Sequence, residues 1–224
     1  MAWLWPRLVF ALGLAGAVCF VWPDAALAGA RGPSLTIRVR VNNYTLASDA
    51  LLAAAERDAS QIFGDAGLTL SWLTCSTGHS KAVQQDPCNE PPEATDIILR
   101  VLSAPAGSEF QDTVFGFAVH PLLASVYYDR VLLRAMTDDA TFEVHFILGC
   151  VIAHEIGHLL IGSNGHSSSG VMQARWDRKQ IRQAVTGSLL FTPEQVRLIQ
   201  AGIQTRKKLR AAITKERALG TVER

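Results

Sequence analysis

The stretch from Phe146 to Gly162 constrains the fold of this 224-residue chain more than any other, because it is almost wholly apolar and still carries three ionisable side chains. Apolar residues lie nearly all round a helix formed by this stretch, so the helix is either buried in a core or spans a membrane. Near the centre of a bilayer, His154, Glu155 and His158 would each be costly. In a soluble domain the same three side chains need only one compensating partner, a metal ion. The sequence therefore predicts a buried helix with a metal at its polar face.

The segment His154-Glu155-Ile156-Gly157-His158 has the pattern HExxH. Four residues of an α-helix turn through about 400°, so the two imidazoles lie on one face, within reach of one zinc ion. Glu155 flanks the metal without binding it. It can take a proton from zinc-bound water, whose pKa the metal lowers to about 7, and deliver it to a leaving amine. The pattern thus predicts zinc and a general base.

A third zinc ligand is expected, because catalytic zinc commonly has three protein ligands and one open position. His166 is the first candidate, since Gly162 can end the helix in a left-handed conformation and the chain can then return to the metal. The alternative is that His166 is a solvated loop residue and the third ligand is a carboxylate elsewhere, with Asp177 the first to consider.

A turn that contains a methionine, Ser168 to Met172, follows His166. Met172 lies six residues after that histidine. With this turn, the segment 154–172 resembles the metzincin clan of zinc peptidases, whose motif is HExxHxxGxxH followed by a methionine turn. It looks especially like small secreted bacterial members of that type. The family pattern has glycine where this chain has Ile161 and histidine where it has Asn164, so the glycine is one position late and the histidine two.

The resemblance implies one zinc ion per chain and a peptide or protein substrate. It assigns roles to six residues: the zinc ligands His154, His158 and His166, the general base Glu155, the chain-bending Gly162 and the Met-turn residue Met172. It also implies that residues 114–120 form an edge strand that pairs with an extended peptide. Trp176 is expected to pack beneath the site, and no tyrosine follows Met172 to assist an oxyanion.

Apolar periodicity predicts the remaining elements. Strands are expected at 35–41, 68–73, 96–102, 114–120 and 125–128, and a helix is expected at 48–63. The helix with the HExxH segment is expected from about Ala140, after the N-cap candidates Thr137, Asp138 and Asp139. A C-terminal helix is expected to start with a capping box at 192–195. This order predicts an α+β fold, in which a mixed twisted β-sheet carries a covering helix, an active-site HExxH helix and a C-terminal helix, as in zincins.

The first 28 residues are interpreted as a signal peptide cut after Ala28, because a short apolar run follows Arg7 and ends at Pro23. The alternative is an uncleaved anchor, but the run is shorter than a spanning helix. The protein is therefore expected to be secreted or periplasmic, without a stable membrane anchor. Residues 29–224 would form one catalytic domain, with an upper part at about 34–162 and a lower part at about 163–224.

Export gives the cysteines an oxidising compartment. Cys75 and Cys88 flank a polar segment and are expected to form a disulfide, whereas Cys150 in the apolar helix is expected to be a buried free thiol.

Charge gives no reason to expect nucleic acid, because 21 basic residues face 20 acidic residues. The basic run Arg206, Lys207, Lys208 and Arg210 is interpreted as a solvated helix face. No function is assigned to His79, His120 or His145.

Two functions are consistent with these features: a secreted zinc-dependent endopeptidase, or a zinc-containing but catalytically inactive domain that binds a surface or extracellular partner. Three histidines beside an intact Glu155 favour the peptidase, because purely structural zinc sites more often use four protein ligands.

Overall fold

The computed structural model describes residues 35–75, 87–93, 95–105, 114–138, 143–162 and 165–220, all within one compact unit, Pro33–Arg224. The predicted signal peptide, residues 1–28, lies outside the described residues. So do His79, Asn164 and the predicted start of the zinc helix at Asp139 and Ala140.

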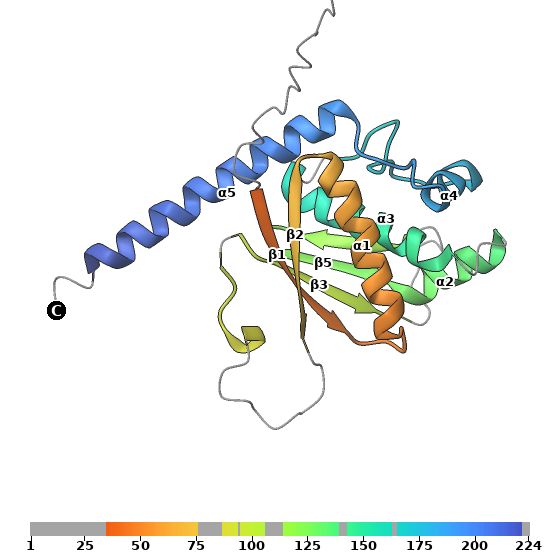
Figure 1. Cartoon of the computed structure of the whole chain (residues 1–224), viewed down its shortest axis with the longest axis horizontal. Coiled ribbons are helices and arrows are strands. Elements are labelled where there is room, and N and C mark those ends of the chain that lie inside the picture. Colours follow the sequence, from red (N-terminus) through yellow and green to blue (C-terminus); the bar gives the residue numbers. More distant parts are fainter. Residues whose placement is uncertain are drawn as a thin grey trace, which may run out of the picture. The chain divides into compact units, whose positions relative to one another are not determined.

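A five-stranded mixed sheet forms the centre of the fold, in the order β2-β1-β3-β5-β4 (Figure 1). The strands are β1 (Leu35–Asn43), β2 (Leu68–Cys75), β3 (Ile97–Leu102), β4 (Gly116–Val119) and β5 (Leu123–Tyr127). The first three and β5 run parallel, and only β4 is antiparallel, at one edge beside β5. The inward residues of the central strand β3 are fully buried, as expected for a strand covered on its packed face. The five predicted strands are therefore present, with shifted ends.

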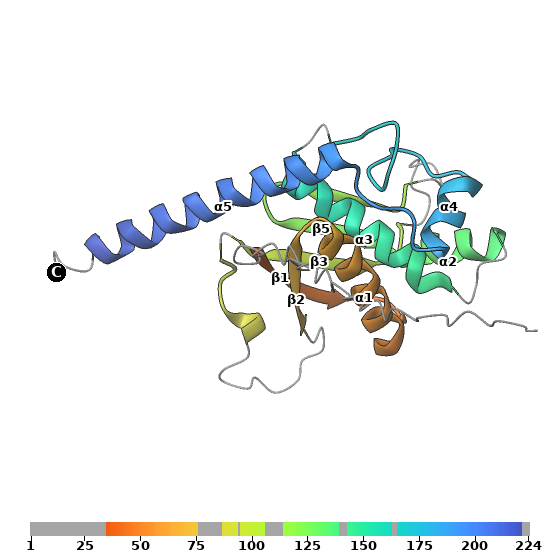
Figure 2. The ribbon, with the colours of Figure 1, turned by 45° about the horizontal axis from the view of Figure 1, so that its top comes forward.

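The helices α1 (Asp49–Asp65) and α3 (Val144–Ile161) pack against each other, and α3 also contacts β4 and β5 (Figure 2). Small residues permit this close approach. A Cβ at Gly149 of α3 would lie 2.9 Å from the Ala55 carbonyl oxygen of α1. His145, to which no function was assigned, joins the same two helices through a 2.7 Å contact between Nδ1 and the Asp58 carboxylate.

The helix α3 is long and apolar enough to cross a membrane, but most of its residues are buried inside the protein. It is thus a core helix, as its ionisable residues predict. Together with the mixed sheet it confirms the predicted α+β fold class.

Two of the three N-cap candidates, Thr137 and Asp138, are wrong. Thr137 is the last residue of an unpredicted helix, α2 (Tyr128–Thr137), and Asp138 follows its C-terminus. Its carboxylate accepts hydrogen bonds from Arg134 at 2.5 Å and Arg178 at 3.3 Å. In the described residues α3 begins at Val144, after Glu143, which makes no side-chain cap. A short acidic cluster can thus end one helix as readily as it starts the next.

Two helices follow the zinc segment. The short α4 (Arg178–Val185) was not predicted; Asp177 caps it, with its carboxylate accepting from the Lys179 amide at 2.6 Å. The long α5 (Pro193–Gly220) starts with the predicted capping box, in which Gln195 accepts from the Thr192 amide at 2.9 Å.

The basic run of α5 is only partly solvated, so its interpretation needs correction. Lys207 and Lys208 are exposed, and Arg210 pairs with Glu93 at 2.5 Å. Arg206, however, is buried against backbone carbonyls of other elements. The reason is its helical position one turn beyond Gly202, on the face of α5 that packs on α3.

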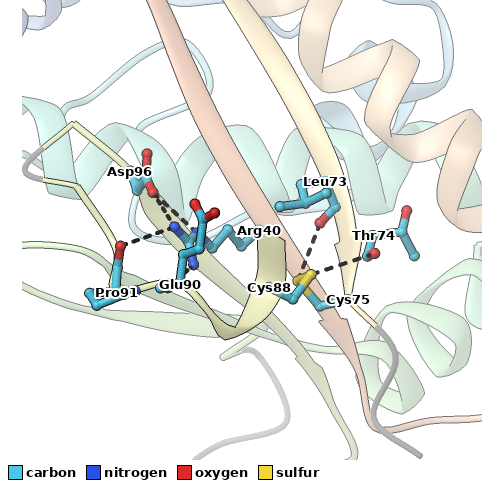
Figure 3. Close-up of a disulfide and its surroundings, with 8 residues drawn as sticks. All are labelled: Arg40, Leu73, Thr74, Cys75, Cys88, Glu90, Pro91 and Asp96. Carbon is cyan, nitrogen blue, oxygen red and sulfur yellow. Dashed lines mark hydrogen bonds and ion pairs between the residues drawn. A yellow bond between two sulfur atoms is a disulfide. The ribbon is translucent and has the colours of Figure 1, made fainter. Parts of the chain in front are cut away.

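The predicted disulfide between Cys75 and Cys88 is present, with a Cα–Cα distance of 5.7 Å (Figure 3). It joins the end of β2 to a 3₁₀ turn, η1 (Pro87–Asn89). The chain after this turn is held by Arg40, which donates to the Glu90 carbonyl and to the Asp96 carboxylate. Cys150 is a buried free thiol, as predicted, and burial raises its pKa to about 12.

Candidate metal centre and active site

The structure brings together the three predicted histidine ligands. His154 and His158 lie one turn apart on α3, and His166 returns from the segment after the helix. The Nε2 atom of His158 lies 3.1 Å from Nε2 of both His154 and His166. A tetrahedral ion with Zn–N bonds of 2.0–2.1 Å needs nitrogens about 3.3 Å apart. The three side chains therefore fit zinc with only a small outward shift.

The orientation of His154 is fixed by a hydrogen bond from its second ring nitrogen. Nδ1 lies 2.7 Å from the carbonyl oxygen of Val171, which leaves Nε2 for the ion. Burial, the largest cause, lowers the pKa of His154 and that of His158 to about 4. Both imidazoles are consequently neutral near pH 7, which is the form that binds metal.

The turn after α3 depends on Gly162, as predicted, but in a different conformation. Its φ of 110° and ψ of 172° combine a positive φ with an extended ψ, so the residue is not in the left-handed helical region. A Cβ at this position would meet nothing within 4 Å. Backbone conformation alone therefore favours glycine there, because other residues rarely adopt it.

Met172 packs against the turn of α3 between His154 and His158 and is fully buried. A Cβ at Gly157, between the two helical histidines, would lie 2.5 Å from its sulfur. A Cβ at Gly165 would lie 3.4 Å from its terminal methyl. Because Gly157 and Gly165 have no side chains, Met172 can pack against both α3 and the segment that follows it.

Glu155 is buried at 5% exposure, and its carboxyl lies against the edge strand. A Cβ at Gly116 of β4 would be 2.8 Å from Oε1 of Glu155. Burial raises the pKa of Glu155 to about 8. In the described part of the chain no residue donates a hydrogen bond to this carboxyl, so its oxygens are left for the cavity. A cation held by the three histidines would favour the ionised form again.

A cavity of about 530 Å³ opens over the histidines and Glu155. Its walls come from β4 and its flanks, from α3, and from the segment after Met172. The side chains include Phe115, Phe117 and Trp176, whose ring lies 5.9 Å from that of His154. Trp176 therefore borders the site as expected. His120, to which no function was assigned, also lines this cavity.

The alternative ligand Asp177 is not part of the histidine group, because its carboxylate caps α4. Sequence reasoning missed three supports of the site: Gly116, Gly157 and the Val171 carbonyl. Only Gly157 carried a local signal, since a glycine inside an apolar helix often marks a close packing contact.

The chain is similar to known proteins in its structure. No protein-family model matches this sequence. No curated protein is significantly similar to it. Among solved structures, the chain is similar to the archaemetzincin of Methanopyrus kandleri, with 18% identity and a TM-score of 0.49. The match covers 77% of this chain and 98% of the other.

Proposed function

We propose that this protein is a zinc-dependent endopeptidase that holds one zinc ion per chain on His154, His158 and His166. One observation carries the proposal: the Nε2 atoms of three histidines converge beside a buried carboxyl group, and both face one cavity. A purely structural zinc site has no use for Glu155, whose burial without a hydrogen-bond donor is costly.

Zinc, when bound, would acidify a water molecule and polarise the carbonyl of the scissile peptide bond. Glu155 would receive the proton of that water and deliver it to the leaving nitrogen. Gly116 keeps the wall of β4 close enough to hold the carboxyl in place. The Val171 carbonyl keeps His154 in the orientation in which Nε2 faces the ion. Phe115 and Trp176 would exclude bulk water from the bound peptide.

The substrate in this proposal is an extended peptide that pairs with the free edge of β4. An edge strand has unpaired backbone groups and can add a further strand by hydrogen bonding. Among the described strands β4 has only β5 as a neighbour, and its residues line the cavity. The peptide would then be enclosed between β4 and the segment after Met172. The strand belongs to the proposed upper part, 34–162, and the segment belongs to the proposed lower part, 163–224.

Secretion belongs to the same proposal. The Cys75–Cys88 disulfide is compatible with an oxidising compartment. The leader pattern of residues 1–28 predicts cleavage after Ala28. N-terminal sequencing of protein recovered from the medium or periplasm of an expressing bacterium should find Gly29 first. Protein retained in the membrane with an intact N-terminus would contradict this part of the proposal.

The decisive experiment combines metal content with peptide cleavage. Residues 29–224, purified with the disulfide formed, should contain about one zinc per chain by elemental analysis and should cleave members of a random peptide library. Glu155→Gln should abolish cleavage and retain zinc. His166→Ala should lose or greatly weaken zinc, whereas Asp177→Asn, the matched control, should keep it.

Three results would contradict the proposal. Absence of zinc in the parent protein would remove its basis. Cleavage by Glu155→Gln at the parental rate would exclude the proposed base. Zinc held equally tightly after His166→Ala would place the third ligand elsewhere. Zinc without cleavage of any peptide would favour the inactive binding domain.

A further inference from the structure

Arg206 of α5 bridges two elements that border the cavity. Its Nη2 atom donates to the backbone carbonyl of Leu159 at 3.0 Å and also to that of Pro121. Leu159 lies in the last turn of α3, and Pro121 lies in the turn between β4 and β5. One guanidinium group thus joins the end of the zinc-binding helix to the turn that follows the edge strand.

This arrangement is costly for the fold. Arg206 is 9% exposed, and within the described part of the chain its Nη1 atom has no hydrogen-bond partner. Burial lowers the pKa of Arg206, and no carboxylate among the described residues offsets that effect. A buried cation without a counter-ion destabilises a folded protein. An apolar side chain of similar length would pack α5 onto α3 without this cost, so packing alone does not account for an arginine.

The two carbonyls explain what the arginine contributes. Carbonyls in the last turn of a helix have no partner within the helix and carry partial negative charge, so a cation there is stabilising. Close approach of α5 makes the contact direct, since a Cβ at Gly202 would lie 1.9 Å from the Leu160 carbonyl oxygen. On the other side, Pro121 follows His120, which lines the cavity together with Leu159.

We propose that Arg206 is a positioning residue that holds β4 and its turn against the end of α3 and thereby sets the width of the cavity. Arg206 is not among the residues that line the cavity, so it acts through the two backbone segments that it binds. The effect of Arg206 on substrate rests on the proposed function, because it requires this cavity to be the substrate site. The effect of Arg206 on the position of β4 does not, because it is a property of the metal-free fold.

The first test is amide hydrogen exchange on the metal-free, oxidised protein. Arg206→Met removes charge-assisted hydrogen bonds worth about 1.5–3 kcal/mol, so exchange in residues 116–123 should rise about tenfold or more. Exchange in helix α1 should change less than about twofold, because the hydrogen bonds of Arg206 within the described part of the chain go to α3 and to the turn between β4 and β5. Arg206→Lys, which keeps a cationic donor, should restore most of the protection. Arg210→Met, which removes the exposed pair with Glu93, is the matched control and should leave residues 116–123 unchanged.

Two outcomes of this test overturn the inference: unchanged exchange in residues 116–123, or an equal rise there and in α1, which would mean general destabilisation. If Arg206→Met does not fold, Arg206→Lys decides the matter. A small rise confined to residues 116–123 then supports positioning, and an unchanged or uniform pattern refutes it.

The second test measures cavity width in the zinc-loaded protein with two hydroxamates. Acetohydroxamate reports on the metal alone, whereas 3-phenylpropanohydroxamate also contacts the cavity wall. Arg206→Met should weaken the phenyl compound about tenfold and acetohydroxamate less than about twofold, with zinc content unchanged. Equal weakening of both compounds, or of neither, would refute a role in cavity width. Because the exchange test needs no zinc and no cleavage, failure of the peptidase proposal would be seen separately.

Discussion

Replacing Gly157 by alanine should destabilise this protein, although the same change stabilises most helices. In an ordinary helix interior, glycine to alanine gains about 1 kcal/mol. At Gly157 the new methyl would lie 2.5 Å from the Met172 sulfur and 3.2 Å from the Phe191 ring. Met172 is fully buried, so its sulfur would have to shift within the packed core. Overpacking of a core costs about 1–3 kcal/mol, so the net expectation is a loss of about 1 kcal/mol.

The sign of this effect should reverse when the methionine is removed. Met172→Ala alone should cost about 2–5 kcal/mol through the cavity it leaves. In that background the methyl of Gly157→Ala has room, so the helix gain of about 1 kcal/mol should appear. The expected coupling between the two sites is therefore about 2 kcal/mol.

Urea denaturation of the oxidised protein in a chelator measures this cycle without a contribution from metal binding. The four free energies of unfolding come from the parent, the two single variants and the double variant. A Gly157→Ala variant that is about 1 kcal/mol more stable than the parent would refute the close packing of Met172 beneath the helix. A coupling energy near zero would refute it as well.

Three further predictions concern residues away from the metal. Burial raises the pKa of Glu56 from 4.5 to about 7. The contribution of Glu56 to stability is therefore fully present below pH 4.5 and is lost as the pH rises through 7. In urea titrations, Glu56→Gln should raise the free energy of unfolding by about 1 kcal/mol at pH 8, after allowance for partial exposure, and should leave it unchanged at pH 4. Cys150 should resist iodoacetamide at pH 8 until denaturant is added, because burial raises its thiol pKa to about 12; rapid native-state labelling, followed by mass spectrometry, would show that it is accessible. Replacing both Cys75 and Cys88 by serine should cost about 3 kcal/mol of unfolding free energy, as expected for a disulfide that closes a loop of 13 residues; an unchanged midpoint of unfolding would contradict this.

The convergence of the three histidines was predictable because its geometry is local. The spacing of His154 and His158 fixes both imidazoles on one helix face without knowledge of the rest of the fold. His166 follows after a short return, and Met172 lies a few residues beyond it. The central strands were predictable for a similar reason, since apolar alternation has a period that belongs to the strand itself.

The remaining errors concern features that depend on tertiary contacts. Arg206 has the same basic neighbours as the solvated Lys207, and only the packing of α5 on α3 distinguishes them. Asp138 looked like the start of a helix because its residue type suits an N-cap, yet its actual partners, Arg134 and Arg178, come from a preceding and a later helix. Gly116 carried no signal at all, because its neighbour Glu155 is distant in sequence.

The three histidines lie within 13 consecutive residues of α3 and its return, whereas the cavity wall at β4 is attached through the sheet. Closing so short a loop costs little chain entropy, while assembly of the edge strand requires many distant contacts. The proposed zinc ion could therefore bind before the sheet is complete and stay bound after the sheet edge has frayed. Under gradual denaturation we expect peptide binding to be lost first and metal last, so that a partly unfolded population would hold zinc and have no place for a substrate.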